Sequence, residues 1–328
     1  MFNVLLKKAA YGLAILFALC CIAPASAGTA DDYPSKPIKI IVPYAAGGTG
    51  DTFARALGHS FERTLGQSVI VEDRPGAGSN IGTRDVAQSK PDGYTLLLTG
   101  NSFAVNVSLF KTLPYSLSDF TPITLLSEIS YVMVVSPTLP VKNLQEFIAY
   151  AKAHPNGVFF GSSGIGGGEH LSGELMNSIA GLTMTHVPFK AATDMLTNLI
   201  GNNIQVTFPS MLTAMPLIKS GRLHALAVTA PHRSKFLSDV PTMSESGLPE
   251  FKMYGWYGLL APAGTPPKIV KLLHDATVTA LKDPSVIKTI ETGGSEAIGS
   301  TPGEFQEFLK SYVNFSSKII ESTGIPKQ

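Results

Sequence analysis

Short apolar runs that alternate with amphipathic segments are the feature that most limits the folds open to this chain. Residues 38–44 (IKIIVPY), 68–73 (SVIVED) and 94–100 (YTLLLTG) are rich in branched and apolar residues, which favours strands. Apolar residues recur at helical spacing from Ala54 to Leu65, and a short helix is expected over residues 80–89. This strand–helix order predicts a parallel sheet covered by helices.

The same alternation restarts after Pro140. The expected elements are helix 143–153, strand 157–162, helix 169–180, strand 183–188, helix 193–201, strand 204–208, helix 211–220, strand 223–229, strand 254–262, and helices 267–282, 284–291 and 302–321. Two such units predict two lobes, with apolar crossovers at 129–137 and 251–262 and the C-terminal helices returning to the first lobe. A ligand would then bind in the cleft where the carboxyl ends of both sheets meet.

The first 27 residues have the three parts of a secretory signal peptide. Lys7 and Lys8 precede an apolar run, and the small residues Ala-Ser-Ala follow it at positions 25–27. The run is short for a membrane span. We therefore expect residues 1–27 to direct the chain to the periplasm and to be removed.

Cysteine and charge content narrow the class of protein further. Cys20 and Cys21 both lie in the leader, and the residues before them are too large for a lipidation motif, so the mature chain needs no disulfide and has no thiol nucleophile. Of the 25 basic and 24 acidic residues, the leader contains Lys7 and Lys8 and no acid, which leaves 23 basic against 24 acidic. Without a basic run, no nucleic-acid partner is expected.

A glycine-rich turn joins the first predicted strand to the first helix in VPYAAGGTGDTFARALG, residues 42–58. Phe53 stands where a dinucleotide fingerprint needs Gly or Ala, and no Gly-Lys-Ser/Thr follows as in a P-loop. The free amides around Ala46 to Thr49 suit a carboxylate or small anion at a helix N-terminus. Asp51 is available as the helix N-cap. A turn without a ligand remains equally open on this stretch alone.

A second turn of the same kind lies in the other predicted lobe, in FFGSSGIGGGEHLSGEL, residues 159–175. One anion-ready turn in each lobe is what a cleft closing on a carboxylated ligand needs, and Ser162 and Ser163 add hydroxyl donors. Ile165 stands where the nucleophile elbow of a hydrolase needs glycine. The pair of turns therefore favours a binding site.

The remaining polar residues predict neither a metal site nor a catalytic site. His170 and His186 are the histidines near the loops, and neither has metal-ligand spacing. His170 either reaches the cleft or has a structural role, and Lys190 either neutralises a ligand carboxylate or is solvated. No nucleophile–base–acid set can be assembled, so we expect no enzyme activity, no metal and no cofactor.

Six stretches taken together resemble one family. They are VPYAAGGTGD, EDRPGAGSNIGTRDVAQSKPDGYTLLLTG, THVPFKA, IKSGRLHALAVT, DVPTMSESGLPEF and APAGTPP. In this order they resemble the Bug receptors, the extracytoplasmic solute-binding proteins of tripartite tricarboxylate transporters, from about Tyr33 to the C-terminus. The resemblance implies an α/β, two-lobed periplasmic-binding-protein fold (type II-like), in which each lobe is a mostly parallel sheet flanked by helices. The implied lobes are 33–133 with 255–328, and 134–254.

The resemblance also implies which residues bind the ligand carboxylate. In the family this group is held by backbone amides, hydroxyls and bridging waters from both glycine-rich loops. The matching positions here are Tyr44, Ala45, Gly47, Gly48, Asp51, Asn101 and Ser102 in the first lobe, and Ser162, Ser163, Gly164, His170, Lys190, Ala191, Phe208 and Ser210 in the second.

Two positions depart from the family pattern. Members often have acids in the stretch that matches NNIQVTFPSM, residues 202–211, where this chain has Gln205 and Pro209. If the second acid normally meets an amine or hydroxyl of the ligand, its loss predicts a less polar distal end. We therefore expect a mono- or dicarboxylate, including aromatic ones, rather than an amino acid.

The resemblance implies partners as well. A monomeric receptor would capture a small carboxylate and deliver it to integral membrane permease subunits, by a lobe closure that the ligand stabilises. A ligand-sensing receptor that signals to a membrane partner is the main alternative, and an exported α/β enzyme is the third.

Overall fold

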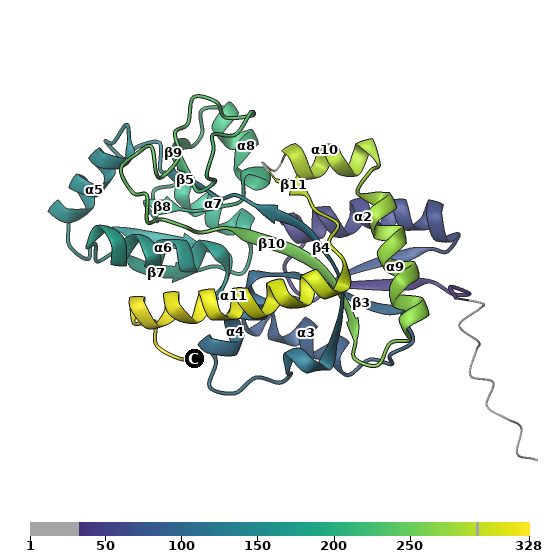
Figure 1. Cartoon of the computed structure of the whole chain (residues 1–328). Helices are drawn as coiled ribbons and strands as arrows, with labels where there is room; N and C mark the ends of the chain where they lie inside the picture. Colours follow the sequence, from purple (N-terminus) through teal and green to yellow (C-terminus); the bar gives the residue numbers. More distant parts are fainter. Residues whose placement is uncertain (1–32, 293–294) are drawn as a thin grey trace, which may run out of the picture. The chain divides into compact units, whose positions relative to one another are not determined.

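The first of two sheets gathers strands from both ends of the chain. This computed structural model describes residues 33–292 and 295–328, so the predicted signal peptide lies outside the described residues. The strand order of the six-stranded sheet is β11-β4-β10-β3-β1-β2 (Figure 1). Its strands are β1 (Ile38–Val42), β2 (Val69–Asp73), β3 (Thr95–Gly100), β4 (Phe120–Ile129), β10 (Gly255–Pro262) and β11 (Glu296–Ala297).

The first three strands of this sheet are parallel, as the alternation of strands and helices predicts. Helix α2 (Thr49–Leu65) joins β1 to β2, and α3 (Asn80–Ala87) joins β2 to β3. Right-handed crossovers that run in opposite directions place their helices on opposite faces of a sheet, and Figure 1 shows this arrangement. Strand β10 lies antiparallel between β3 and β4, which makes the sheet mixed.

The second sheet has five strands in the order β7-β6-β8-β5-β9. The strands are β5 (Val132–Val135), β6 (Phe159–Ser162), β7 (Thr185–Pro188), β8 (Val206–Thr207) and β9 (His224–Val228). Strand β6 pairs in parallel with β7 and β8, whereas β5 is antiparallel to β8 and β9. The helices that lie between the strands of this sheet in the chain are α5 (Leu144–Ala153), α6 (Gly168–Ala180), α7 (Ala192–Ile200) and α8 (Met211–Lys219).

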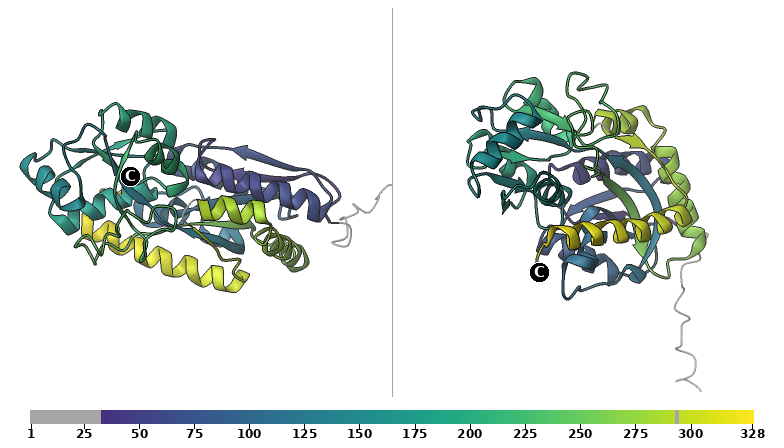
Figure 2. Two further views of the ribbon diagram at one scale, coloured as in Figure 1. Left: turned by 90° about the horizontal axis from the view of Figure 1, so that it is seen from above. Right: turned by 60° about the vertical axis from the view of Figure 1, so that its left-hand side comes forward.

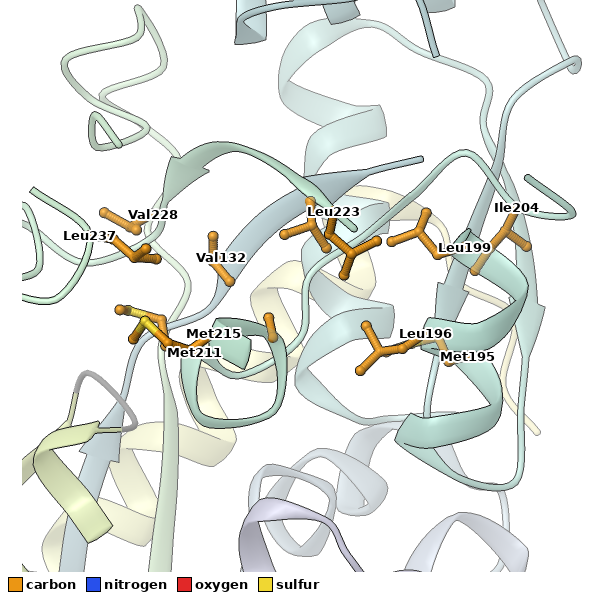
Figure 3. Close-up of a cluster of buried hydrophobic side chains, with 12 residues drawn as sticks. Val132, Met195, Leu196, Leu199, Ile204, Met211, Met215, Leu223, Val228 and Leu237 are labelled. Atoms are coloured by element: carbon orange, nitrogen blue, oxygen red, sulfur yellow. The ribbon is translucent and has the colours of Figure 1, made fainter. Parts of the chain in front are cut away.

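Apolar side chains from α7, α8 and the sheet form the core beside β5 (Figure 3). Met195 and Leu199, one turn apart on α7, are 0% exposed, as is Met211 at the start of α8. Val132 of β5 and Val228 of β9 contribute from the sheet. The helical spacing of apolar residues therefore places one face of α7 against the sheet.

The crossovers between the sheets are shorter than the apolar runs that predict them. Within residues 129–137, β4 ends at Ile129 and β5 begins at Val132, so only two residues separate the two strands. Strand β10 begins at Gly255, inside the predicted run 251–262. The fold is two-lobed, with two mixed sheets flanked by helices, while the exact division of the chain into 33–133 with 255–328 and 134–254 stays a prediction.

The C-terminal helices return to the six-stranded sheet. They are α9 (Pro267–Ala280), α10 (Pro284–Thr292) and α11 (Pro302–Thr323), and the helix that precedes β4 is α4 (Asn101–Leu109). Helix α11 packs on α4 and β4 and also contacts α6 (Figure 2). Two short 3₁₀ turns, η2 (Ala77–Ser79) and η3 (Leu117–Asp119), complete the fold. Among the described residues, no helix is long and apolar enough to cross a membrane.

Candidate ligand-binding site

A cavity of about 560 Å³ opens where loops from both sheets meet. This volume lies in the range of small-molecule sites. Ten of the fifteen residues proposed from the sequence line it: Tyr44, Ala45, Gly48, Asn101, Ser102, Ser163, Gly164, Lys190, Ala191 and Ser210. The other five, which are Gly47, Asp51, Ser162, His170 and Phe208, lie outside its lining.

The first glycine-rich loop runs from the end of β1 to the start of α2. Gly47 has φ +78°, which favours glycine, and Gly48 is the N-cap of α2 with no side-chain cap. The Asp51 carboxylate accepts a hydrogen bond from the Gly47 amide at 2.8 Å and pairs with Arg55 Nε at 2.6 Å. Asp51 thus holds the loop through the Gly47 amide, and the amides that remain free for a ligand lie around Gly48 and Thr49.

Hydroxyl groups line the wall next to this loop. Tyr44 Oη accepts from the Gly100 amide at 2.9 Å and hydrogen-bonds Ser102 Oγ at 2.9 Å. Ser79 Oγ donates to Ser102 Oγ at 2.8 Å. Burial raises the pKa of Tyr44, so the phenol stays neutral at physiological pH. This wall therefore offers neutral donors and acceptors to a ligand.

Asn101 links this wall to the crossover between the sheets. Its Nδ2 donates to Tyr131 Oη at 3.2 Å and to the Tyr254 carbonyl at 3.3 Å, and its Oδ1 accepts from the Trp256 amide at 3.0 Å. These bonds occupy most of the capacity of the amide. Asn101 lines the cavity, but its main effect in this structure is to hold Tyr131 and β10 in place.

The second glycine-rich loop, between β6 and α6, is supported from behind by two histidines. Ser162 Oγ hydrogen-bonds His186 Nε2 at 2.7 Å, and the Gly166 amide donates to His170 Nδ1 at 3.2 Å. The two imidazole rings stack with centroids 4.0 Å apart. Burial lowers the pKa of His170 to about 4 and that of His186 to about 3, so both are neutral at pH 7. Of the two roles open to His170, the structure places it in the supporting one.

One hydrogen bond joins the two walls of the cavity. Ser210, the N-cap of α8, hydrogen-bonds Thr49 Oγ1 at the start of α2, with the two oxygens 2.6 Å apart. Phe208, two residues earlier, is fully buried and stacks on Phe251 with ring centroids 5.9 Å apart. Lys190 is exposed at the rim.

The two positions that depart from the family pattern lie away from the cavity lining. The Gln205 side chain accepts from the Phe159 amide at 2.9 Å and donates to the Asn202 carbonyl at 3.1 Å. Pro209 is buried. Neither position therefore contacts the cavity directly, and the expectation of a less polar distal end stays a prediction.

Several lining residues were not proposed from the sequence. Tyr131 and Tyr257 reach the cavity because β4, β5 and β10 meet there, which no local pattern reveals. Glu169 follows the second glycine-rich loop directly and was visible in the motif GGGEH. A third glycine-rich segment around η2 also contributes to the lining, with Ala77 and Ser79 at positive φ. Within residues 33–292 and 295–328, no group of three or more His, Cys, Asp or Glu side chains is placed to hold a metal ion.

Comparison with known proteins agrees with this geometry. The two-lobed α/β fold is that of periplasmic binding proteins, and a solved structure of the periplasmic binding protein BugD superposes with a TM-score of 0.86 at 32% identity, covering 90% of this chain and 100% of that one. Residues 53–325 match the tripartite tricarboxylate transporter family receptor (TctC), and the chain belongs to this family of solute-binding receptors.

Individual relatives extend the comparison to ligands. Protein BugT of Bordetella pertussis (strain Tohama I) is 36% identical over 299 residues, which cover 90% of this chain and 92% of BugT. The structure of Rpa4515 of R. palustris with adipate has a TM-score of 0.87 at 30% identity and covers 90% of this chain and 99% of that one. MatC (Rpa3494) of Rhodopseudomonas palustris, with bound malate, has a TM-score of 0.84 at 29% identity over 88% of this chain and 100% of that one. Relatives of this chain thus bind carboxylates.

Proposed function

We propose that this chain is a periplasmic receptor that binds a small carboxylate between its two lobes and delivers it to integral membrane permease subunits. The observation that carries the proposal is the cavity between two glycine-rich loops, each at the start of a helix, whose amides and neighbouring hydroxyls suit a carboxylate. The relatives with bound adipate and malate support the same ligand class.

The mono- or dicarboxylate, including aromatic ones, would contact the ten lining residues given above. Apolar side chains in the same lining, among them Ile129 and Phe189, would cover its carbon skeleton. The five proposed residues outside the lining would act by holding the loops. We further propose that the receptor is a monomer with a signal peptide at 1–27, with the lobe boundaries predicted above, and that it catalyses no reaction.

Trp256 provides the readout for a test. It is the single tryptophan of the chain, is 0% exposed and borders the cavity. A bound carboxylate should change its fluorescence. By mass action, it should also raise the free energy of unfolding by about 2.7 kcal/mol at a ligand concentration of 100 Kd, which raises the melting temperature. A panel of mono-, di- and tricarboxylates, aromatic ones included, that produces neither change refutes the carboxylate assignment.

Uptake separates the transport role from the sensing alternative. Deleting the receptor gene should abolish uptake of the radiolabelled ligand that the panel identifies. Unchanged uptake, together with loss of a ligand-induced change in transcription, would instead support a receptor that signals to a membrane partner. Turnover of carboxylic esters or amides by the purified protein would favour the third alternative, an exported enzyme.

A further inference from the structure

The cavity contains one acidic side chain. Glu169 is the second residue of α6 and lines the cavity directly after the second glycine-rich loop. Among the lining residues of the described chain, the other charged side chain is Lys190 at the rim. A receptor for anions thus has a carboxyl group in its own binding cavity, and this placement needs a physical reason.

Among the described residues, the Glu169 carboxyl has a hydrogen-bond donor but no neighbouring cation. Ser163 Oγ donates to Glu169 Oε1 at 3.1 Å, and the nearby backbone amides of Ser163 and Glu169 act to lower the pKa of the carboxyl. Within the described residues, no Lys, Arg or His is among the groups that act on it, and desolvation raises its pKa. Asp51, the third residue of α2, differs because it lies outside the cavity lining and pairs at 2.6 Å with Arg55, which also pairs with Asp73 at 3.2 Å.

Glu169 shares the cavity lining with Tyr44, Tyr131 and Tyr257. A negative charge on its carboxyl would raise the pKa of each of these phenols. Tyr44 lies in the loop after β1, Tyr257 belongs to β10, and Tyr131 lies in the crossover between β4 and β5. A ligand held between the walls therefore lies within reach of the Glu169 charge.

We propose that Glu169 determines specificity by selecting monocarboxylates whose other end carries a hydrogen-bond-donating group, an ammonium or a hydroxyl, over dicarboxylates. This inference rests on the proposed function, because it assumes that a ligand carboxylate occupies the cavity. Such a ligand places its carboxylate on the neutral amides and hydroxyls and its donor against Glu169.

Two physical effects produce this selection. An ionised carboxyl has about four lone-pair sites, and the hydrogen bond from the Ser163 hydroxyl leaves sites for a ligand donor. A second ligand carboxylate at that place would instead meet a like charge in a desolvated site, where repulsion costs far more than in water.

The test compares ligands of equal length whose distal group differs. Adipate, 6-hydroxyhexanoate, 6-aminohexanoate and hexanoate form one series, and terephthalate, 4-(hydroxymethyl)benzoate, 4-(aminomethyl)benzoate and 4-methylbenzoate form an aromatic one. Isothermal titration is performed on the wild type, Glu169→Gln and Glu174→Gln. Glu174 is the matched control, because it lies on the same helix but outside the cavity lining.

In at least one series, the wild type should bind the amino or hydroxy ligand at least about tenfold more tightly than the dicarboxylate, a difference of about 1.4 kcal/mol. Glu169→Gln retains an acceptor for Ser163 and removes the charge, so the preference for the amino ligand should fall at least about tenfold. Glu174→Gln should keep the wild-type preference. The melting temperatures of the unliganded variants check that both fold.

Two failures are distinguishable. If carboxylates bind but the dicarboxylate binds as tightly as its amino and hydroxy counterparts, or if Glu169→Gln leaves the preference unchanged, the role of Glu169 is refuted while the receptor function stands. If no carboxylate of the wider panel binds the wild type, the proposed function itself fails, and the role of Glu169 fails with it.

Discussion

Replacing Gly168 by alanine should weaken both the fold and ligand binding, because the first residue of α6 packs directly on Tyr131. A Cβ atom at Gly168 would overlap the Oη and Cζ atoms of the Tyr131 ring. The ring is 4% exposed, and its hydroxyl is held by Asn101 at 3.2 Å. On its other side, a Cβ atom at Gly255 would also overlap Tyr131 Oη, so little free space remains for the ring to move.

The size of the effect follows from overpacking. Extra methyl groups in a well-packed core cost about 1–3 kcal/mol. With an unfolding entropy of about 2 cal/mol/K per residue, a chain of this length should lose roughly 2–5 °C in melting temperature. The displaced α6 carries the second glycine-rich loop with it, and affinity for the carboxylate should fall about tenfold, the equivalent of one strong hydrogen bond.

Scanning fluorimetry and isothermal titration measure the two effects. Gly303→Ala is the matched control, since a Cβ atom there meets nothing within 4 Å and the residue lies in α11, away from the cavity. That variant should keep the wild-type affinity and melt at or slightly above the wild-type temperature. In a double-mutant cycle, Tyr131→Leu should offset part of the stability loss of Gly168→Ala by removing the overlapping atoms. A Gly168→Ala protein with wild-type stability and affinity would contradict this account.

Three further predictions concern the same loops. Because burial lowers the pKa of His170 to about 4 and of His186 to about 3, below the unfolded value of about 6.5, the unfolded state binds more protons in that interval. The free energy of unfolding should therefore fall as pH drops from about 6.5 towards 4, by at most about 1.4 kcal/mol per pH unit per histidine. His186→Asn should flatten the profile of melting temperature against pH. A flat profile for the wild type would refute the role of the two histidines. Gly48→Val should abolish carboxylate binding and leave the melting temperature nearly unchanged, since the nearest atom to a Cβ there is a carbonyl oxygen at 3.4 Å. Unaltered affinity would mean that the first loop does not bind the ligand. Thr49→Val removes the hydroxyl that meets Ser210 across the cavity, so ligand affinity should fall about three- to tenfold in titrations, and an unchanged affinity would mean that this bond does not support the bound state.

The elements with a clear local pattern were predictable from sequence. The strand predicted over residues 38–44 is observed as Ile38–Val42, ending where Pro43 has no amide hydrogen to continue the ladder. Helix α4 was missed because its residues are buried nearly all round, from Asn101 to Leu109, and so show no amphipathic stripe. Strand β4 was missed because Pro122 interrupts its apolar run; the structure accommodates it beside a register shift between β4 and β10.

The lining of the cavity was predictable from the sequence only in part. Both glycine-rich loops carry their signal in adjacent residues, which is why most of the residues proposed there line the cavity. Tyr257 could not be found in this way, because it reaches Tyr44, with ring centroids 6.1 Å apart, only through the insertion of β10 between β3 and β4. Sequence position also did not distinguish a residue that faces the cavity from one that supports a loop, as His170 and Asp51 illustrate.

Each glycine-rich loop is held by a carboxyl near the start of the following helix, but the two carboxyls have different charged neighbours. In each, a carboxyl near the start of the helix accepts a hydrogen bond from the preceding loop: Asp51 from the Gly47 amide and Glu169 from the Ser163 hydroxyl. Asp51 pairs with Arg55, which it shares with Asp73, and it lies outside the cavity lining, so the first loop presents amides and hydroxyls to a ligand. Glu169 lines the cavity and has no neighbouring cation among the described residues, so a charge on its carboxyl would disfavour a ligand carboxylate placed beside it. If Glu169 has the role that we propose, a ligand with one anionic end binds with that end on the first loop, because the opposite orientation would place its carboxylate against Glu169.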